Sequence, residues 1–398
     1  MIAALLIAVL LALGAGAGAL GLVARRSRQD GAGPAEMPRV WLVRPLAGVD
    51  EELEARLVRG PKDGASCETI FTVAEAQDPA WPVAERAAAA LRAQGLEASA
   101  LVCPPRGANP KAGQLAALLE LRAPPRFLVS ADADVDLGQL SLGPLIRPLI
   151  TGQAAASWMA PAEGPRARTL GDQVSIALLG RSFHAFPFLA AVDRGTFVGK
   201  LYALDLAAVG DAPRRLVDIL GEDLALAQRI KELGLRVVLV PGAAPAGILG
   251  KSWSDVVARQ RRWISVIRGQ RPLLLLSYPL FFFPRWTAAP LLLWLLLREP
   301  RWAAALALGL ALVAALPGRA VPRIHRGPWW ALPLAELTMA IAFVQALSSR
   351  TVTWRGRRYR VAPGGHLSSA PPAPQRPARG RDPATIETRA ARAPDRPR

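Results

Sequence analysis

Phe127-Leu-Val-Ser-Ala-Asp132-Ala-Asp134-Val-Asp136 is a short apolar run that ends directly in alternating carboxylates. The apolar half predicts a buried strand. In open α/β sheets the ligand site lies outside the carboxyl ends of the strands, so these acids stand where such a site is expected. Carboxylate oxygens suit Mg²⁺ or Mn²⁺, which bind through one or two carboxylates together with substrate phosphates. The stretch therefore predicts an α/β fold with an acidic site beside this strand.

Short apolar runs and helical patterns alternate on both sides of this stretch, from residue 38 to residue 240. This alternation is typical of βα units and predicts a mainly parallel sheet within one domain, residues 38–271. The predicted strands are Val40–Val43, Thr69–Val73, Ala98–Cys103, Phe127–Ser130, Ala154–Met159 and Arg236–Val240, and the predicted helices are Pro82–Gln94, Pro110–Leu121 and Glu222–Leu233.

The N-terminal segment has the pattern of a membrane anchor. Met1–Val23 contains only apolar residues and glycine, and Arg25, Arg26 and Arg28 follow at once. A cleaved signal peptide is the alternative, but it normally has basic residues before its apolar stretch, and here they come after it. We therefore expect an uncleaved anchor, residues 1–24, with its C-terminal side in the cytoplasm.

The C-terminal third returns to membrane-like composition. Three apolar blocks, Pro272–Leu297, Trp302–Leu316 and Pro328–Leu347, are separated by basic residues. Three crossings would place the Arg-rich tail outside, so we expect residues 272–348 to make two crossings plus one interfacial or third helix. Residues 349–363 are predicted to be a basic juxtamembrane segment, and residues 364–398, rich in Pro, Ala and Arg, a disordered tail.

Charge and cysteine content limit the partners and the compartment. The net charge is +18, and the residues from Ser349 onward, with twelve basic and three acidic side chains, supply half of it. A basic flank after apolar segments favours anionic lipid, so no nucleic acid partner is expected. Only Cys67 and Cys103 are present, which excludes a disulfide framework or a cysteine zinc site. We expect an integral protein of a bacterial-type inner membrane with a cytoplasmic catalytic domain.

Other interpretations of the acidic stretch remain open. Asp132, Asp134 and Asp136 imitate the start of an EF-hand loop, but Gly138 comes one place late and Gly143 stands where a bidentate Glu is required. Calcium is therefore disfavoured. An ordinary acidic loop after a strand is the second alternative.

A second acidic motif, Leu220-Gly-Glu222-Asp223-Leu, stands at a predicted helix start. Acids there also complement the helix dipole, which is the simpler explanation. The chain has three histidines, His184, His325 and His366, and the last two lie outside the α/β region. A carboxylate is therefore favoured as the general base for a reaction that activates a hydroxyl.

A third motif, Arg259-Gln-Arg261-Arg262-Trp263, lies immediately before the apolar blocks. It is equally consistent with a juxtamembrane basic cluster beside an interfacial Trp and with guanidinium groups that hold a diphosphate next to an indole that closes a pocket.

Taken together in chain order, these motifs resemble the signature of inverting GT-A glycosyltransferases of the ceramide glucosyltransferase and hopanoid-biosynthesis glycosyltransferase type. The resemblance covers about Val40 to Val361. Its main motifs are Gln77-Asp78-Pro79, Asp132-x-Asp134, Asp223 and Arg259-x-x-Arg262-Trp263, and its smaller ones are Arg44-Pro45-Leu46, Gly107-Ala-Asn109-Pro110-Lys111 and Trp354-Arg355-Gly356.

The resemblance implies a GT-A (Rossmann-like) nucleotide-sugar-binding domain with N-terminal and C-terminal transmembrane helices. It implies inverting transfer of glucose or N-acetylglucosamine from a UDP-sugar to the hydroxyl of a ceramide-like or hopanoid-like lipid, with Mg²⁺ or Mn²⁺ as cofactor. The roles that it implies are the general base for Asp223, nucleotide-sugar binding for Asp78 and Lys111, metal and diphosphate binding for Asp132 and Asp134, and the diphosphate and acceptor end for Arg259, Arg262 and Trp263.

The departures from the family pattern leave alternatives. The block Ala-Asp132-Ala-Asp134-Val-Asp136 allows the matching acid pair to shift by two positions. A polysaccharide synthase shares the signature, although few membrane segments are present for a channel. A polyprenyl-phosphate acceptor would need no base. A non-catalytic membrane scaffold with a lipid-binding basic tail is the alternative from a different class.

Overall fold

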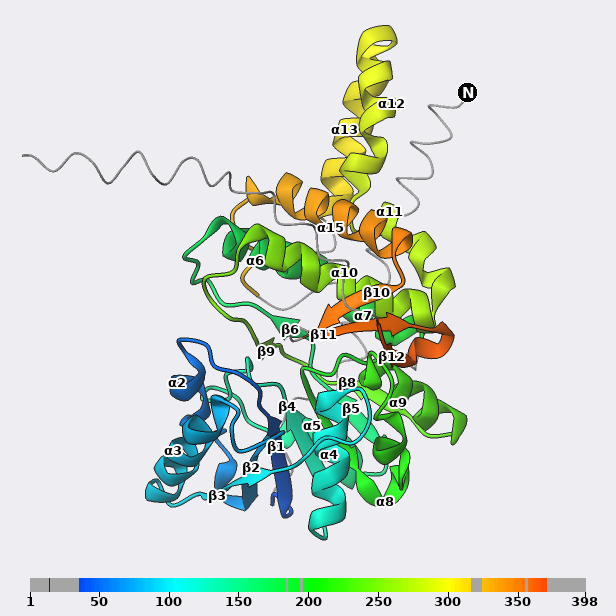
Figure 1. The fold of residues 1–398 in the computed structure, drawn as a ribbon. Coiled ribbons are helices and arrows are strands. Elements are labelled where there is room, and N and C mark those ends of the chain that lie inside the picture. The colour runs from blue at the N-terminus through cyan, green and yellow to red at the C-terminus, as the bar shows by residue number, and fades with distance from the viewer. Residues whose placement is uncertain are drawn as a thin grey trace, which may run out of the picture.

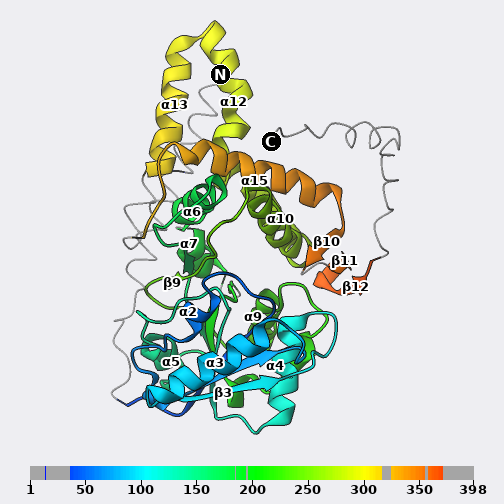
Figure 2. The ribbon, with the colours of Figure 1, turned by 60° about the vertical axis from the view of Figure 1, so that its left-hand side comes forward.

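The computed structural model describes residues 36–370, apart from 184, 194–195, 316–323 and 355–356, together with the isolated residue 14. An α/β domain lies at one end, a layer of helices covers it, and a helical hairpin projects at the other end (Figures 1 and 2). The predicted anchor, residues 1–24, lies outside the described residues except for residue 14, and so does the chain after residue 370.

A seven-stranded sheet in the order β3-β2-β1-β4-β7-β5-β8 forms the centre of the α/β domain. All six predicted strands are present. The mainly parallel sheet is in fact mixed, because the unpredicted β7 lies antiparallel between β4 and β5. The strands are β1 (Val40–Pro45), β2 (Cys67–Val73), β3 (Glu97–Val102), β4 (Phe127–Ala131), β5 (Ala156–Trp158), β7 (Leu201–Asp205) and β8 (Val237–Leu239), and a separate pair joins β6 (Pro161–Ala162) to β9 (Ala244–Pro245).

Helices cover both faces of the sheet because side chains alternate along each strand. On β1, Val43 packs in the cluster that holds Leu118 of α4, while Leu42 packs with Ile146 of α5 on the opposite face. The result is a three-layer arrangement with a buried sheet. The helices of this domain are α2 (Leu53–Leu57), α3 (Ala80–Ala93), α4 (Pro110–Leu121), α5 (Gly143–Ile150), α8 (Leu206–Val209) and α9 (Glu222–Glu232), with the 3₁₀ turns η1 (Gly64–Ser66) and η2 (Ala212–Leu216).

A second layer packs three long helices together (Figure 2). These are α6 (Leu170–Ser182), α10 (Trp253–Gln270) and α15 (Ala331–Ser348), which share one apolar cluster. Capping boxes fix the starts of two of them, through Thr169 and Asp172 for α6 and through Ser252 and Asp255 for α10. The short helix α7 (Ala185–Val192) follows α6.

The chain after α15 forms a small antiparallel sheet of β10 (Thr351–Trp354), β11 (Arg357–Val361) and β12 (Leu367–Ser369), with the turn η4 (Pro363–Gly365) before β12. The predicted disordered tail was expected to begin at Gly364, and the structure corrects this boundary. Leu367 and Val361 are buried in an apolar cluster with Leu220, which supplies the packing that holds this segment in place.

The apolar blocks form η3 (Pro272–Ser277), α11 (Tyr278–Phe281), α12 (Pro284–Arg298), α13 (Pro300–Ala315) and α15. The helices α12 and α13 pair as the projecting hairpin (Figures 1 and 2). Among the described residues, α15 alone is a single helix long and apolar enough to cross a membrane, and a second candidate arises only if α6 and α7 count as one bent span. The number of crossings that we predicted from the sequence stays a prediction.

Candidate functional site

The acidic loop after β4 places two carboxylates around one ammonium group. The Nζ of Lys200 lies 2.9 and 2.7 Å from the two carboxylate oxygens of Asp134, and 3.1 Å from Oδ2 of Asp132. Lys200 is the residue before β7, and its carbonyl accepts the backbone N–H of Asp132 at 2.9 Å. The antiparallel strand β7 therefore brings Lys200 to the end of β4.

Lys111 connects this pair to the second acidic motif. Its Nζ lies 2.7 Å from Oδ1 of Asp132 and 3.3 Å from Oε1 of Glu222, and it donates to the carbonyl of Gly199 at 2.7 Å. Asn109 caps α4 by accepting from the N–H of Lys111, and its amide donates to Glu222 at 2.9 Å. The capping geometry at this helix start thus aims Lys111 into the cluster.

A buried arginine holds the backbone of the loop that carries Asp132 and Asp134. Arg44, at the end of β1, is 1% exposed, and its Nη2 donates to the carbonyls of Asp132, Ala133 and Val135 at 3.2, 3.3 and 2.6 Å. Burial, with the nearby positive charge of Arg56, lowers the pKa of Arg44 to about 10. Three carbonyls converge on one buried guanidinium, so the backbone path of the loop is fixed.

The third acid of the stretch points elsewhere. Asp136 pairs with Arg59 at 3.0 Å and accepts the N–H of Gly138. Asp132 and Asp134 share Lys200, whereas Asp136 is bound to a different cation. The geometry therefore favours Asp132 and Asp134 over the pair shifted by two positions.

Asp223 lies one residue past the start of α9, in the same cluster. Its Oδ2 accepts the N–H of Gly199 at 2.7 Å, and its Oδ1 accepts the N–H of Leu224 at 2.8 Å. Burial, together with the negative charge of Glu222, raises the pKa of Asp223 to about 6. A carboxylate with such a pKa suits proton transfer near neutral pH.

Gly199 fits this position because a side chain would not. A Cβ on residue 199 would lie 2.8 Å from Cβ of Asp223 and 3.0 Å from its Oδ2. The backbone of Gly199 and Lys200 contacts the Asp223 carboxylate and the backbone N–H of Asp132, and the Lys200 side chain contacts both Asp132 and Asp134. The dipeptide is the structural connection between the two acidic motifs.

Asp132 is held in its ionised form by the two lysines of the cluster. Burial alone would raise the pKa of Asp132, but the ammonium groups of Lys111 and Lys200 more than offset this and hold the pKa well below its usual range. Asp132 is thus a permanent negative charge, while Asp223 can exchange a proton. The two motifs are electrostatically suited to different tasks.

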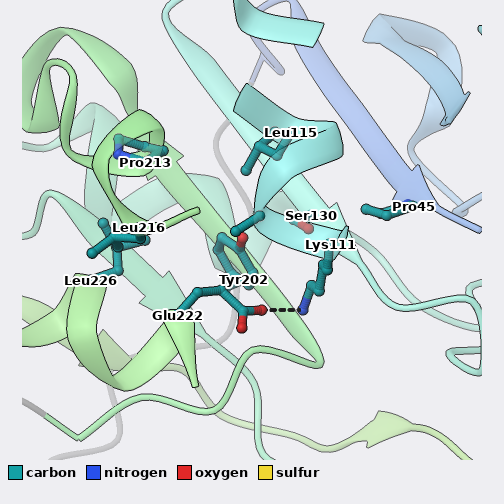
Figure 3. Close-up of a pocket in the computed structure, with 10 residues that line it drawn as sticks. Pro45, Lys111, Leu115, Ser130, Tyr202, Pro213, Leu216, Glu222 and Leu226 are labelled. Atoms are coloured by element: carbon teal, nitrogen blue, oxygen red, sulfur yellow. Dashed lines mark ion pairs between the residues drawn. The ribbon is translucent and has the colours of Figure 1, made fainter. Parts of the chain in front are cut away.

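A small, mostly apolar pocket lies beside the cluster (Figure 3). Lys111 and Glu222 point toward one another at one side of it, and the Lys111 ammonium lies over the ring of Tyr202, 5.7 Å from the ring centroid. The remaining lining residues are Pro45, Ala112, Leu115, Ser130, Pro213, Leu216 and Leu226. This lining is mostly apolar and supplies few polar groups beside the charged cluster.

Asp78 lies at the carboxyl end of a neighbouring strand, in the loop between β2 and α3. Its Oδ1 accepts the backbone N–H groups of Gly48 and Ala80 at 2.8 and 2.9 Å. Within the described chain, its Oδ2 has no protein partner. This oxygen is the part of Asp78 that is open to a ligand.

The residues of the third motif lie on α10, which belongs to the helical layer. Arg259 pairs with Glu163 at 2.9 Å, donates to Ser175 at 2.6 Å and lies over the ring of Trp263. Arg262 lies 5.8 Å from the centroid of the Trp354 ring. Among the described residues, none of the contacts of Arg259 or Trp263 involves the acidic cluster.

Sequence reasoning did not assign a role to Lys200, Gly199 or Glu222. Glu222 was noticed only as a helix-start acid, and Lys200 precedes a strand that was not predicted. The available signal was Val198-Gly199-Lys200 directly before the apolar run of β7. Without a predicted partner strand, nothing placed this segment beside Asp132.

The donor set fits a cation that shares its coordination with a substrate. Asp132 and Asp134, which lie on one loop, both contact the ammonium of Lys200. Carboxylate oxygens such as theirs are hard ligands that suit Mg²⁺ or Mn²⁺. Within the part of the chain that the structure describes, no group of three or more His, Cys, Asp or Glu side chains could hold a metal ion. The two carboxylates fit a cation that takes its remaining ligands from phosphate oxygens.

Comparison with known proteins identifies the family. The family model named glycosyl transferase family 21 matches residues 4–367, almost the whole chain. The chain belongs to glycosyl transferase family 21. It is therefore a glycosyltransferase that uses nucleotide sugars. A search of curated protein sequences gave no match.

A search of solved structures found similar chains. The mannosyltransferase PcManGT from Pyrobaculum calidifontis, in complex with GDP-Man and Mn²⁺, is 20% identical and aligns over 87% of this chain and 99% of its own, with a TM-score of 0.52. TarS residues 1–349 from S. aureus, in complex with UDP-GlcNAc, is 12% identical over 84% of this chain and 99% of its own, with a TM-score of 0.39. The first likeness confirms the expected GT-A architecture for this member of the family.

Proposed function

We propose that this family 21 enzyme transfers glucose or N-acetylglucosamine from a UDP-sugar to the hydroxyl of a ceramide-like or hopanoid-like lipid, with inversion and with Asp223 as general base. The observation that carries the proposal is the position of Asp223. A carboxylate with a pKa of about 6 is joined through Gly199 and Lys200 to the carboxylate pair Asp132 and Asp134. The proposed proton acceptor and the pair of carboxylates proposed to hold the cation are thus kept at a fixed separation.

The reaction is one in-line displacement. The lipid hydroxyl gives its proton to the Asp223 carboxylate as its oxygen forms a bond to the anomeric carbon, while the bond from that carbon to the diphosphate oxygen breaks. The ammonium groups of Lys111 and Lys200, which both contact Asp132, would stabilise the negative charge that accumulates on the leaving diphosphate. Inversion follows because the attacking and leaving oxygens lie on opposite faces of the carbon.

Asp132 and Asp134 would hold the divalent cation. The complex of PcManGT with GDP-Man and Mn²⁺ supports this choice of cofactor. When bound, such a cation neutralises the charge of the departing diphosphate. Asp78, with its free Oδ2, is proposed to contact the uridine moiety.

We place the acceptor on the side of the helical layer, where α10 carries Arg259, Arg262 and Trp263. Arg259 is held by Glu163, which follows β6, and by Ser175 of α6, so its guanidinium has a fixed orientation. This layer lies between the α/β domain and the projecting hairpin (Figure 1). A lipid that stays in a bilayer around the hairpin would approach the cluster across α10.

The hairpin itself supports a membrane location. Its two helices pack through Leu295, Leu306 and Leu310, and large apolar side chains cover the outside. These exposed side chains are Trp286, Leu293, Trp294, Leu296 and Leu297 on α12 and Trp302 and Leu308 on α13. An exposed apolar surface of this kind marks a membrane or protein contact.

We propose that α12 and α13 are the two crossings and that α15 is the interfacial helix. Helix α12 has 15 residues, or about 22 Å at 1.5 Å per residue, which is less than the roughly 30 Å of bilayer hydrocarbon. Arg298 and Arg301 lie at the tip and could reach the far headgroups by snorkelling. Helix α15 instead packs on α10, and its Glu336 is buried against Arg285 of α12.

A labelling experiment tests the hairpin. Leu297→Cys, at a side chain that is 75% exposed, is labelled with an environment-sensitive fluorophore in lipid vesicles. We expect blue-shifted emission that lipids with bromine in their acyl chains quench. The native thiols Cys67 and Cys103 are buried, so the label is specific. Leu121→Cys, 61% exposed on α4, is the matched control and should show neither change, and an unquenched label at residue 297 would refute insertion.

The activity is tested by incubating membranes that carry the protein with radiolabelled UDP-sugars, with and without EDTA. Metal-dependent label in extractable lipid, from UDP-glucose or UDP-N-acetylglucosamine, is the expected result. The product lipid then identifies the acceptor. Failure of every donor to label lipid in membranes that contain ceramide, hopanoid and polyprenyl phosphate would overturn the proposed reaction.

A further inference from the structure

Lys200 occupies the space that a cation shared by Asp132 and Asp134 would take. Its Nζ lies within 3.1 Å of one oxygen of Asp132 and within 2.9 Å of both oxygens of Asp134. Its backbone is fixed, because its carbonyl accepts the N–H of Asp132. Its side chain is only 20% exposed, so the ammonium is withdrawn from water and committed to these two carboxylates.

The charge of the cluster explains why a cation must stand there. Among the described residues, the ion pairs of the three carboxylates Asp132, Asp134 and Glu222 are made with Lys111 and Lys200. Lys111 pairs with Asp132 and Glu222, and Lys200 provides the counter-charge of Asp134. Partly buried carboxylates at short range repel each other strongly without a counter-charge. Lys200 therefore keeps the acid pair assembled while no donor is bound.

The arrival of a donor changes this balance. A nucleotide diphosphate brings its own negative charge, and a divalent cation cannot share the space with an ammonium 3 Å away without strong repulsion. A lysine has a flexible four-carbon stem and binds phosphate as a point charge. It can leave the carboxylates for the phosphate oxygens by rotation of its side chain alone.

We propose that Lys200 is a built-in counter-cation that holds the place of the divalent cation while the donor site is empty and moves to the diphosphate when donor and cation bind together. The inference rests on the proposed roles of Asp132 and Asp134. It makes cation binding dependent on the nucleotide, so the donor-free enzyme binds the cation weakly. Lys200 then acts as a positioning residue that sets the order of binding.

The test measures Mn²⁺ binding by the full-length protein without any nucleotide, from the electron paramagnetic resonance signal of free Mn²⁺. Lys200→Met should bind Mn²⁺ at least about tenfold more tightly than the unchanged protein, because the competing charge is gone. Lys231→Met is the matched control. Lys231 contacts Asp193 at the surface, two turns along α9 from Asp223, and its loss should leave Mn²⁺ affinity unchanged. Lys200→Gln is measured in parallel, with thermal unfolding of each variant, in case the Met variant does not fold.

A second arm repeats the titration with saturating UDP. UDP should strongly increase the Mn²⁺ affinity of the unchanged protein. In Lys200→Met the factor of this increase should be at least tenfold smaller, because that variant has no ammonium to displace. Equal or weaker donor-free Mn²⁺ binding by the folded Lys200 variants would overturn the inference. If the unchanged protein binds no UDP with or without Mn²⁺, the proposed function fails instead, while the donor-free comparison still decides the role of Lys200.

Discussion

Asp223→Asn should lower kcat for sugar transfer to a lipid hydroxyl by about 10²–10⁴-fold, the usual contribution of a general base. The amide keeps the size of the side chain but cannot accept the hydroxyl proton. UDP binding should change little, because the donor contacts are proposed to come from Asp78, Asp132, Asp134 and Lys111. The measurement is steady-state transfer with the donor found in the labelling experiment, together with UDP affinity by calorimetry.

The matched control is Asp211→Asn, which makes the same chemical change at an exposed carboxylate paired with Arg215. It should retain full activity. An Asn at position 223 can accept only one of the backbone N–H bonds from Gly199 and Leu224, so the unfolding temperature of the variant is compared with that of the unchanged protein. Activity that survives in folded Asp223→Asn would favour a polyprenyl-phosphate acceptor, whose oxygen is already ionised.

The pH profile provides a second readout of the same residue. The active form of Asp223 is the carboxylate, and burial beside Glu222 raises its pKa to about 6. Activity should therefore be constant at neutral pH and fall as the pH drops below about 6, whereas a carboxyl of ordinary pKa would remain active near pH 5. The residual activity of Asp223→Asn should lack this acid limb, and an unchanged limb in that variant would assign it to another group.

Local sequence patterns predicted much of this fold because the decisive signals are short-range. The apolar run before Asp132 is a strand, and helices begin at Pro110 and at Glu222, as expected. The carboxyl ends of β1, β2 and β4 meet at one sheet edge, so Arg44, Asp78 and Asp132 lie along the same edge, and the roles that the resemblance implies for Asp78 and Asp132 stay predictions.

The parts that sequence reasoning missed depend on long-range pairing. Strand β7 inserts antiparallel between β4 and β5, and a short apolar run such as Leu201–Asp205 does not specify its partners. Lys200 enters the site only through this pairing. The ion pair of Arg259 with Glu163 likewise joins residues 96 positions apart, which no motif spacing reveals.

The small C-terminal sheet was also missed, and its place beside the catalytic loop has functional consequences. The N–H of Leu220 donates to the carbonyl of Gly365 at 2.8 Å, and the N–H of Leu367 donates to the carbonyl of Asp218 at 2.7 Å. From the other side, Gln270 of α10 donates to the carbonyls of Leu220 and Gly221. Residues 218–221 lead directly into Asp223, so the sheet helps to fix where the base stands.

Deletion of residues 351–398 should therefore reduce transfer by more than about 10²-fold, because a misplacement of about 1 Å at a catalytic group has an effect of that size. Deletion of residues 371–398 should leave activity largely intact. A cut at Gly364, where the sequence alone placed the start of the tail, would remove β12 and should behave like the longer deletion. Transfer rates of the three proteins, each purified with its membrane segments, decide between these outcomes.

A finer variant keeps this prediction testable if the longer deletions do not fold. Leu367→Ala removes buried side-chain volume from the cluster with Leu220 while the chain stays complete. We expect kcat to fall with little change in UDP affinity, since the loop positions the base and leaves the proposed donor contacts in place. Loss of activity on removing only residues 371–398 would contradict this account, because the basic tail would then carry a function that the site does not explain.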